Sequence, residues 1–145
     1  MLNKRPIAKF PKAESVGDRE WGEEILLVIS EGKFTMKKLK IKKGFSGGLQ
    51  YHRKKDEAAY IISGSLLVTY ENEYGLLVEK TLEKDSWLHF PNGSIHKETA
   101  LTDVELIEVS TPHFNDRVRV EEAFGLDPSS TSGLPTTREE DIITK

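Results

Sequence analysis

Four side chains with metal-binding chemistry lie in two short segments whose glycines and proline recur at fixed intervals. They are Gln50, His52, Glu57 and His96. Two imidazoles, one carboxylate and one side-chain amide offer nitrogen and oxygen donors, which together make a plausible shell for a divalent metal ion. The sequence therefore predicts a metal site, provided that the fold brings the two segments together.

The spacing of the first three of these residues matches a pair of β-strands. Residues two apart on a strand point to the same face, so Gln50 and His52 project together if this run is extended. Glu57 begins the next extended run, and a hairpin between the two runs returns its carboxylate to the same place. His96 must then arrive from a strand that is distant in the sequence.

Short apolar runs separated by Gly, Asn, Asp and Pro predict an all-β sandwich or barrel. The expected strands are residues 24–29, 34–41, 49–52, 57–62, 65–71, 76–82, 86–90, 95–100 and 104–110. A long helical stripe is absent from the sequence, and Asn115 to Phe124 is expected to be one short helix or an irregular segment. We expect three parts: an N-terminal arm over 1–19, the barrel over 20–125 and a polar flexible tail over 126–145.

The composition limits the class of protein. The 145 residues, 37% of them hydrophobic, suit one domain with a single core. The chain has no cysteine, so a metal must be held by nitrogen and oxygen donors. The sequence has no apolar run of bilayer length, and its first residues lack the apolar stretch of a secretory signal. We therefore expect a cytoplasmic protein without a membrane partner.

Basic residues are concentrated early in a chain whose net charge is −3. They are Lys37, Lys38, Lys40, Lys42, Lys43, Arg53, Lys54 and Lys55. Aromatic residues are not interleaved with them, so we expect no nucleic-acid partner. The alternatives are a solvated strand face and one or two cations that point inward to bind an anionic substrate. If Leu39 and Ile41 face the core, alternation places Lys37 on their face and Lys38 and Lys40 in water.

The two metal-binding segments resemble the two conserved motifs of the cupin superfamily. Residues 44–64 resemble the first motif, with Gln50 in the place of the first histidine of its usual His-x-His. Residues 85–96 are similar to the second motif, which normally opens with glycine and here opens with Asp85. The asparagine expected four residues after the motif's histidine is replaced by Ala100.

Within the cupins, the chain is most similar to the barrel of type II mannose-6-phosphate isomerases. The stretches that carry this likeness are residues 20–22, 49–52, 106–109 and 116–121. The resemblance implies a single-domain jelly-roll β-barrel with a metal inside, bound by Gln50, His52, Glu57 and His96. This donor set suits Zn, Mn, Fe, Co or Ni without distinguishing among them. Positions on the metal left open would take water or substrate.

The resemblance also implies a small-molecule substrate, a sugar or sugar phosphate, and aldose–ketose isomerisation as the chemistry. Glu98 and His89 are the candidate bases, and Lys37 and Arg53 are the candidate phosphate clamps. Glu98 lies two residues beyond His96 on the same strand face, but it would equally suit a surface ion pair with a lysine. Type II isomerases usually carry a nucleotidyltransferase domain that this sequence lacks, so turnover stays an open question.

Two further functions compete with isomerisation. One is a metal-dependent oxygenase or decarboxylase of the wider cupin group, and the other is a small-molecule binding module without turnover. Whatever the function, we expect a homodimer. The apolar run Ile25–Ile29 is long enough to need covering if it lies at a sheet edge.

Overall fold

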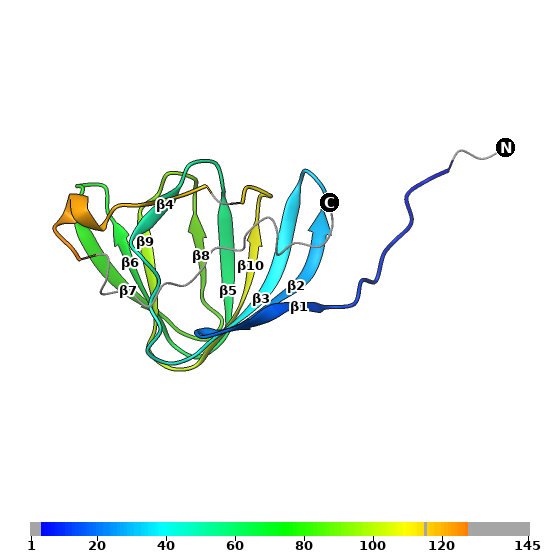
Figure 1. Cartoon of the computed structure of the whole chain (residues 1–145), viewed down its shortest axis with the longest axis horizontal. Helices are drawn as coiled ribbons and strands as arrows, with labels where there is room; N and C mark the ends of the chain where they lie inside the picture. Colours follow the sequence, from blue (N-terminus) through cyan, green and yellow to red (C-terminus); the bar gives the residue numbers. More distant parts are fainter. Residues whose placement is uncertain (1–3, 115, 128–145) are drawn as a thin grey trace.

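The chain folds into two antiparallel β-sheets that face one another, as the computed structural model shows for residues 4–114 and 116–127 (Figure 1). The strands are β1 (Glu14–Arg19), β2 (Gly22–Ser30), β3 (Phe34–Ile41), β4 (Gln50–His52), β5 (Glu57–Ser63), β6 (Leu66–Glu71), β7 (Leu77–Leu82), β8 (Trp87–Phe90), β9 (His96–Ala100), β10 (Val104–Ser110) and β11 (Arg117–Arg119). A single 3₁₀ turn, η1 (Glu121–Phe124), follows them. The predicted all-β barrel is confirmed.

The strand order explains how distant segments meet. One sheet has six strands in the order β1-β2-β3-β10-β5-β8, and the other has five in the order β11-β4-β9-β6-β7. Each pairing between neighbouring strands is antiparallel, as in a jelly roll. Because β4 and β5 belong to opposite sheets, residues that are close in sequence face one another across the barrel. The described part of the chain contains no helix long and apolar enough to cross a bilayer.

Strand β3 shows the alternation that the sequence predicts. Lys37 faces the interior and is 3% exposed, and Ile41 on the same face is equally buried. Lys38 and Lys40 face outward, where their Nζ atoms lie 3.6 and 4.0 Å from the Glu105 carboxylate. The period of two in side-chain direction therefore turns one lysine of the basic cluster into the barrel.

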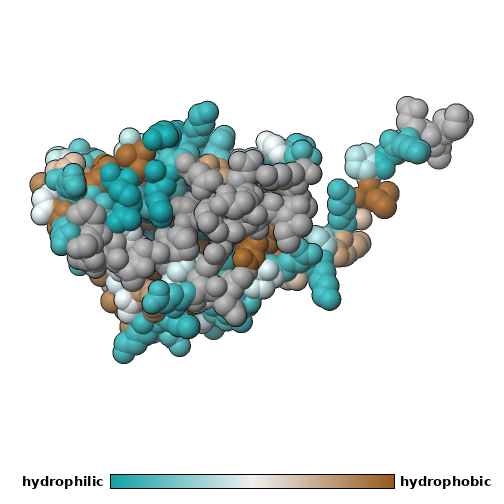
Figure 2. Space-filling model, viewed as in Figure 1, coloured by the Kyte–Doolittle hydropathy of each residue, from teal (hydrophilic) through white to brown (hydrophobic). Residues whose placement is uncertain are grey.

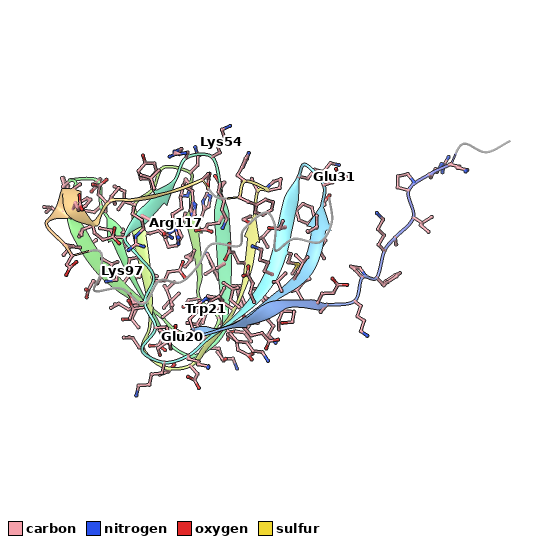
Figure 3. All side chains as sticks on the ribbon, in the orientation of Figure 1. Glu20, Trp21, Glu31, Lys54, Lys97 and Arg117 are labelled. Carbon is pink, nitrogen blue, oxygen red and sulfur yellow. The ribbon has the colours of Figure 1, made fainter. Side chains whose placement is uncertain are left out.

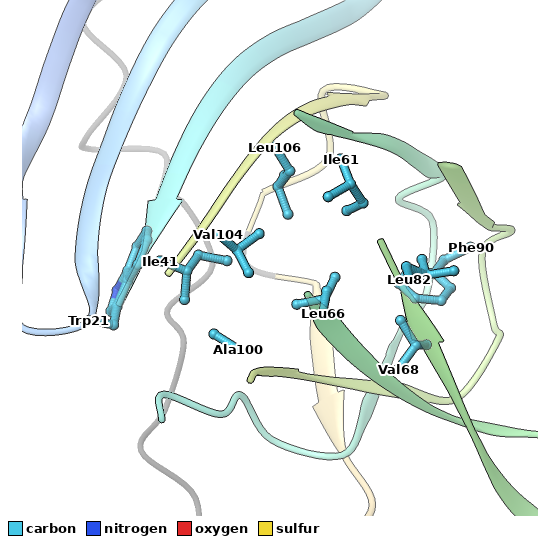
Figure 4. Packing of buried hydrophobic residues seen from close by; sticks show 10 residues of the cluster. All are labelled: Trp21, Ile41, Ile61, Leu66, Val68, Leu82, Phe90, Ala100, Val104 and Leu106. Carbon is cyan, nitrogen blue, oxygen red and sulfur yellow. The ribbon is translucent and has the colours of Figure 1, made fainter. Parts of the chain in front are cut away.

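The hydrophobic core fills the space between the two sheets (Figure 4). Its buried members are Trp21, Ile41, Ile61, Leu66, Val68, Leu82, Phe90, Ala100, Val104 and Leu106. They come from both sheets, so the core holds the sheets at a fixed separation. This rigidity is what positions side chains on opposite strands for a common ligand.

The structure differs from the sequence prediction at both ends of the barrel. The predicted arm contains β1, which pairs with β2, so only residues 4–13 extend away from the barrel (Figure 1). Strand β2 pairs with β3 on one side and with β1 on the other, but the β1 pairing covers only Gly22 to Leu26, so residues 27–29 of the run Ile25–Ile29 have no β1 partner. The segment 115–124, predicted to be one short helix or an irregular segment, contains both β11 and η1. The predicted tail lies almost entirely outside the described residues.

The surface of the protein is mostly polar on the side that Figure 2 shows. The face shown in Figure 2 is mainly hydrophilic, with hydrophobic atoms in separate patches and on the extended N-terminal segment. Ile7 and Phe10 in that segment are 81% and 94% exposed.

Candidate metal centre

Three strands bring the predicted ligands together. Gln50 and His52 lie at the two ends of β4, and His96 begins β9, where it stands opposite Gln50 in the strand register. Glu57 begins β5 in the other sheet and faces them across the barrel. The expected convergence of the two motifs is therefore present in the structure.

The donor atoms of the two histidines and Glu57 form a compact group. One ligand atom from each of the three residues lies within 4.8 Å of the others. The Nε2 atom of His96 is 3.3 Å and that of His52 is 3.7 Å from the same carboxylate oxygen, Oε1 of Glu57. All three side chains are buried, so the donors lie away from bulk solvent.

Neighbouring groups orient both imidazoles toward the centre. The Nδ1–H of His52 donates to Asp116 at 3.0 Å, and the Nδ1–H of His96 donates to the backbone carbonyl of Ser94 at 3.0 Å. In the neutral tautomers that these bonds favour, each Nε2 has its lone pair directed at Glu57. Three electron-rich atoms then face one another in a buried space, which a cation or a proton must occupy. The residues present therefore fit a divalent metal.

Gln50 supplies a fourth candidate donor. Its Oε1 is buried and has no hydrogen-bond partner among the described residues, although the side chain lines the same cavity as the histidines. A buried amide oxygen without a partner costs about 1–3 kcal/mol, so a ligand or ion at this position would stabilise it. All four predicted ligands therefore have donor atoms that suit a metal ion in this cavity.

A buried lysine fixes the second oxygen of Glu57. Lys55 Nζ lies 2.9 Å from Oε2 of Glu57 and 2.9 Å from Oε1 of Glu108, and it is only 5% exposed. Burial opposes the charged forms, but the ion pairs outweigh it: the pKa of Lys55 is raised and that of Glu57 is held well below its usual range. Glu57 is thus an ionised ligand with one oxygen turned to the histidines.

The two histidines titrate differently. Burial lowers the pKa of His52, which keeps its Nε2 unprotonated near neutral pH. Burial acts on His96 in the same direction, but its hydrogen bond to Glu57 and the charge of that carboxylate raise the pKa of His96 overall. A proton on His96 therefore competes with a metal for the space between it and Glu57.

The donors open into a cavity of about 70 Å³ between the sheets. Its lining residues are Trp21, Glu24, Lys37, Leu39, Ile41, Gly47, Gly48, Gln50, His52, Lys55, Glu57, His96, Glu98 and Glu108. Trp21 lies at the end of the barrel opposite the rim that carries Lys54 (Figure 3). Its Nε1–H is buried without a partner among the described residues, so it is available to an acceptor in the cavity.

Two predicted catalytic residues line this cavity. Glu98 is there, and burial followed by the nearby charge of Glu57 raises its pKa to about 7. Lys37 is there too, but its Nζ lies 3.1 Å from Oε1 of Glu24, with both side chains 3% exposed. Its charge is therefore balanced inside the protein, which weakens it as a phosphate clamp.

The other two candidates lie elsewhere. His89 is on β8 with its side chain 59% exposed, and its Nε2 is 2.7 Å from the Asp56 carboxylate. Arg53 is exposed and does not line the cavity. Because neighbouring residues of a strand point to opposite faces, the burial of Phe90 turns His89 outward. The structure thus does not place either residue beside the metal-binding group.

Three residues of the site were not predicted from the sequence. They are Lys55, Glu108 and Asp116. Asp116 begins a stretch that carried the resemblance to the isomerases, which was the available signal. Lys55 sits in a run of charged residues that predicts a solvated turn, and Glu108 looks like an ordinary polar position of an alternating strand. Their roles depend on contacts between distant segments.

No family model and no curated protein matches this sequence. Solved structures do match the fold. Capsular polysaccharide assembling protein CapF from Staphylococcus aureus has 16% identity and a TM-score of 0.65 over 75% of this chain and 32% of its own. Oxalate decarboxylase from Bacillus subtilis has 18% identity and a TM-score of 0.65 over 99% of this chain and 46% of its own. An RmlC-like cupin from Shewanella frigidimarina has 19% identity and a TM-score of 0.60 over 80% and 98%.

These likenesses define the fold. The chain spans about a third of the CapF chain and about half of the oxalate decarboxylase chain. At such low identity they show the architecture and not the activity. The protein has the cupin fold, with a group of two histidines and a glutamate inside it that could hold a metal ion.

Proposed function

We propose that this protein is a metal-binding cupin that binds or acts on a sugar or sugar phosphate, with aldose–ketose isomerisation of the mannose-6-phosphate isomerase type as its chemistry. The observation that carries the proposal is the convergence of His52, Glu57 and His96 on one buried point, beside an unpartnered amide oxygen of Gln50. A divalent metal held there would polarise neighbouring carbonyl and hydroxyl oxygens of a substrate.

The lining of the cavity supports a ligand rich in hydroxyl groups. Four carboxylates and two lysines face it, and the lysines are both paired with carboxylates. Carboxylates accept hydrogen bonds from hydroxyls, whereas an anionic group would meet net negative charge wherever the metal does not compensate. Within the proposed class, the lining favours the sugar over its phosphate as the part that enters the cavity.

The size of the cavity limits how a sugar would sit. A volume of about 70 Å³ is well below the roughly 300–1,000 Å³ of pockets that enclose a whole small molecule. We therefore place only the reacting carbon atoms and their oxygens inside, with the rest of the sugar toward the mouth. Glu98 faces this space from β9 and is the residue we assign to proton transfer between adjacent carbons.

A defined experiment tests isomerisation. The metal-loaded protein is incubated with mannose and with mannose 6-phosphate, and interconversion with the ketose is followed by NMR. We expect conversion by the wild type, its loss in Glu98→Gln, and an unchanged metal content in that variant. Equal conversion by Glu98→Gln would remove the assigned role. An absence of conversion for all sugars tested, with sugar affinity unchanged in Glu98→Ala and Lys37→Ala, would favour a binding module without turnover.

The small cavity also favours a second candidate, a metal-dependent oxygenase or decarboxylase that acts on a small acid. A ligand of a few heavy atoms fits about 70 Å³ entirely, and a metal bound there would compensate the net negative charge that otherwise disfavours an acid. The fold resembles that of oxalate decarboxylase over 99% of this chain. Elemental analysis identifies the metal, and measurements of oxygen consumption and carbon dioxide release with small carboxylic acids separate this chemistry from isomerisation.

We also propose that the protein is a homodimer, and we place the contact on the outer face of the six-stranded sheet. The outer face of the six-stranded sheet carries Ile107 opposite Tyr60, and Val109 beside them on the same face. Tyr60 and Val109 are 42% and 41% exposed. This apolar part of the sheet face lies beside the charged group of Lys38, Lys40 and Glu105, and it suits a second copy of the chain in a two-fold arrangement.

A further inference from the structure

A second cavity lies beside the metal-binding group, on the other side of the Phe90 ring. It is an apolar cleft of about 270 Å³ between β7 and β8, the last strands of the two sheets. Its apolar walls come from both sheets and include Val68, Leu82, Leu88 and Phe90. The ring of Phe90 stacks on that of His96 with 3.8 Å between centroids, so this one side chain separates the cleft from the metal-binding histidine.

The volume and the aromatic lining indicate the size and shape of a ligand. An apolar cavity of about 150 Å³ in another protein binds benzene, so one of about 270 Å³ has room for a fused bicyclic ring. Trp87 and Tyr70 also line the cleft, and the side chain of Trp87 is 75% exposed. Trp87 stands opposite Tyr60 on the outer face of the β5–β8 pair, so its indole borders the mouth of the cleft, where it offers a flat face to the outer part of a planar ring.

Lys80 supplies the charge that would orient such a ring. It stands opposite Val68 in the β6–β7 register, and directly opposed residues share a face, so Lys80 points toward the cleft as Val68 does. Among the described residues it forms no ion pair. An inward-facing lysine on an edge strand also prevents pairing with other chains, a role that requires no ligand. If Lys80 orients a ligand, an acidic ligand should bind more tightly than a neutral one, whereas a lysine that only prevents edge pairing should make no such difference.

We propose that the cleft between β7 and β8 binds a small aromatic carboxylate, with its ring against Trp87 and its acidic group at Lys80. The apolar walls accept the ring and the exposed indole contacts it. Glu71 also lines the cleft, so selection of an anion over a cation requires that the acidic group lies nearer to the Lys80 ammonium group than to the Glu71 carboxylate. This site is independent of the metal cavity and of the function proposed for it.

Three probes with one ring and different charges test the assignment by calorimetry. They are 1-naphthaleneacetate, 1-naphthaleneethanol and 1-naphthaleneethylamine. We expect the acid to bind about fivefold more tightly than the alcohol and the amine to bind most weakly. One charge pair that is partly exposed to solvent contributes an affinity difference of about this size. In Lys80→Glu the order of acid and amine should reverse. Equal affinities for the three probes in the wild type, or an unchanged order in Lys80→Glu, would overturn the proposal.

A matched pair of exposed aromatic residues tests the position of the ring. Trp87→Ala should weaken all three probes about tenfold, whereas Tyr74→Ala should leave them unchanged. Tyr74 is 78% exposed, as Trp87 is 75% exposed, but it does not line the cleft. Circular dichroism confirms that both variants fold. An equal effect of the two substitutions would assign the binding to general surface hydrophobicity and reject the cleft.

A metal control separates the cleft from the metal cavity. A carboxylate can also bind a metal directly, so each titration is repeated on protein stripped with a chelator. Binding to the cleft should survive this treatment. If the acid binds only when metal is present, the carboxylate occupies the metal cavity and the cleft proposal fails, while the proposed metal site gains support.

Discussion

The Nε2 atom of His96 and Oε1 of Glu57 face one another across 3.3 Å, although they begin strands in opposite sheets. The other ring nitrogen of His96, Nδ1, donates to the Ser94 carbonyl, and the other carboxylate oxygen of Glu57, Oε2, is paired with Lys55. Nε2 of His96 and Oε1 of Glu57 are therefore the atoms that remain available to a metal ion between them. Substitution of either residue tests the proposed metal site directly.

Replacement of His96 should abolish stabilisation by metal. At a concentration of 100 times its Kd, a bound metal stabilises the native state by about 2.7 kcal/mol, and thermal unfolding detects this as a rise in Tm. We expect that rise for the wild type with Mn²⁺ or Zn²⁺ and its loss in His96→Gln. His89→Gln is the matched control, because His89 is exposed and lies outside the cavity. Loss of the response in both variants would argue against a site at His96.

Asp116→Asn should weaken metal binding without removing a ligand. The Asp116 carboxylate accepts the Nδ1–H bond of His52 at 3.0 Å and two backbone N–H bonds from Lys54 and Lys55. Groups that orient a ligating histidine contribute about 10–100-fold to metal affinity. Competition with a chelator measures the change. Asp103→Asn is the control, because Asp103 accepts a backbone bond from Lys43 far from the cavity. An unchanged affinity in Asp116→Asn would remove its orienting role.

Lys55→Met should strongly destabilise the metal-free protein. The substitution leaves the carboxylates of Glu57 and Glu108 without the cation that lies 2.9 Å from each of them. Loss of one partner from a buried ion pair costs about 3–5 kcal/mol. Urea unfolding of chelator-treated protein measures the loss. Lys54→Met replaces an exposed neighbour and should change the stability by less than about 0.5 kcal/mol. Similar effects of both variants would contradict the buried role of Lys55.

The predicted ligands could be placed from the sequence because strand alternation fixes side-chain direction. Gln50 and His52 share a face at a spacing of two, and the same rule correctly turned Lys37 inward and Lys38 outward. The rule could not identify Lys55, because its neighbours in sequence are charged and its partner Glu108 is 53 residues away. Contacts between distant strands are set by the sheet order, which alternation does not determine.

Backbone pairing was the second limit of sequence prediction. Strand β1 was predicted as part of an arm, and its segment is rich in charged residues and contains Gly17, yet its backbone pairs with β2. Such pairing depends on main-chain groups and is insensitive to side-chain polarity at an exposed edge. At Asp85, where the cupin motif normally has glycine, the backbone does adopt φ 69°, and its carboxylate accepts a bond from the Tyr60 hydroxyl. Aspartate is one of the few residues that tolerate this geometry.

Gly64→Ala should destabilise the fold more than Gly75→Ala. Both glycines have positive φ, 88° and 75°, so alanine is strained at either position by about 1 kcal/mol or more. A Cβ on Gly64 would also lie 2.0 Å from the backbone oxygen of Asp103, whereas one on Gly75 would meet nothing within 4 Å. The steric conflict should add about 1–3 kcal/mol, which urea unfolding can resolve. Equal losses would show that the β5–β6 turn moves freely away from Asp103.

Val109→Glu should convert the proposed homodimer into a monomer. Val109 is 41% exposed on the outer face of the six-stranded sheet, beside Ile107 and Tyr60, so a two-fold contact there would bring it close to the partner. A glutamate buried in such a contact would lose its hydration without gaining a cation, and its two-fold copy would double the cost. Light scattering measures the mass of each variant. Leu76→Glu is the control, because Leu76 is 61% exposed on the β6–β7 turn, away from this face. A monomeric wild type, or a dimer that persists in Val109→Glu, would exclude this sheet face as the interface.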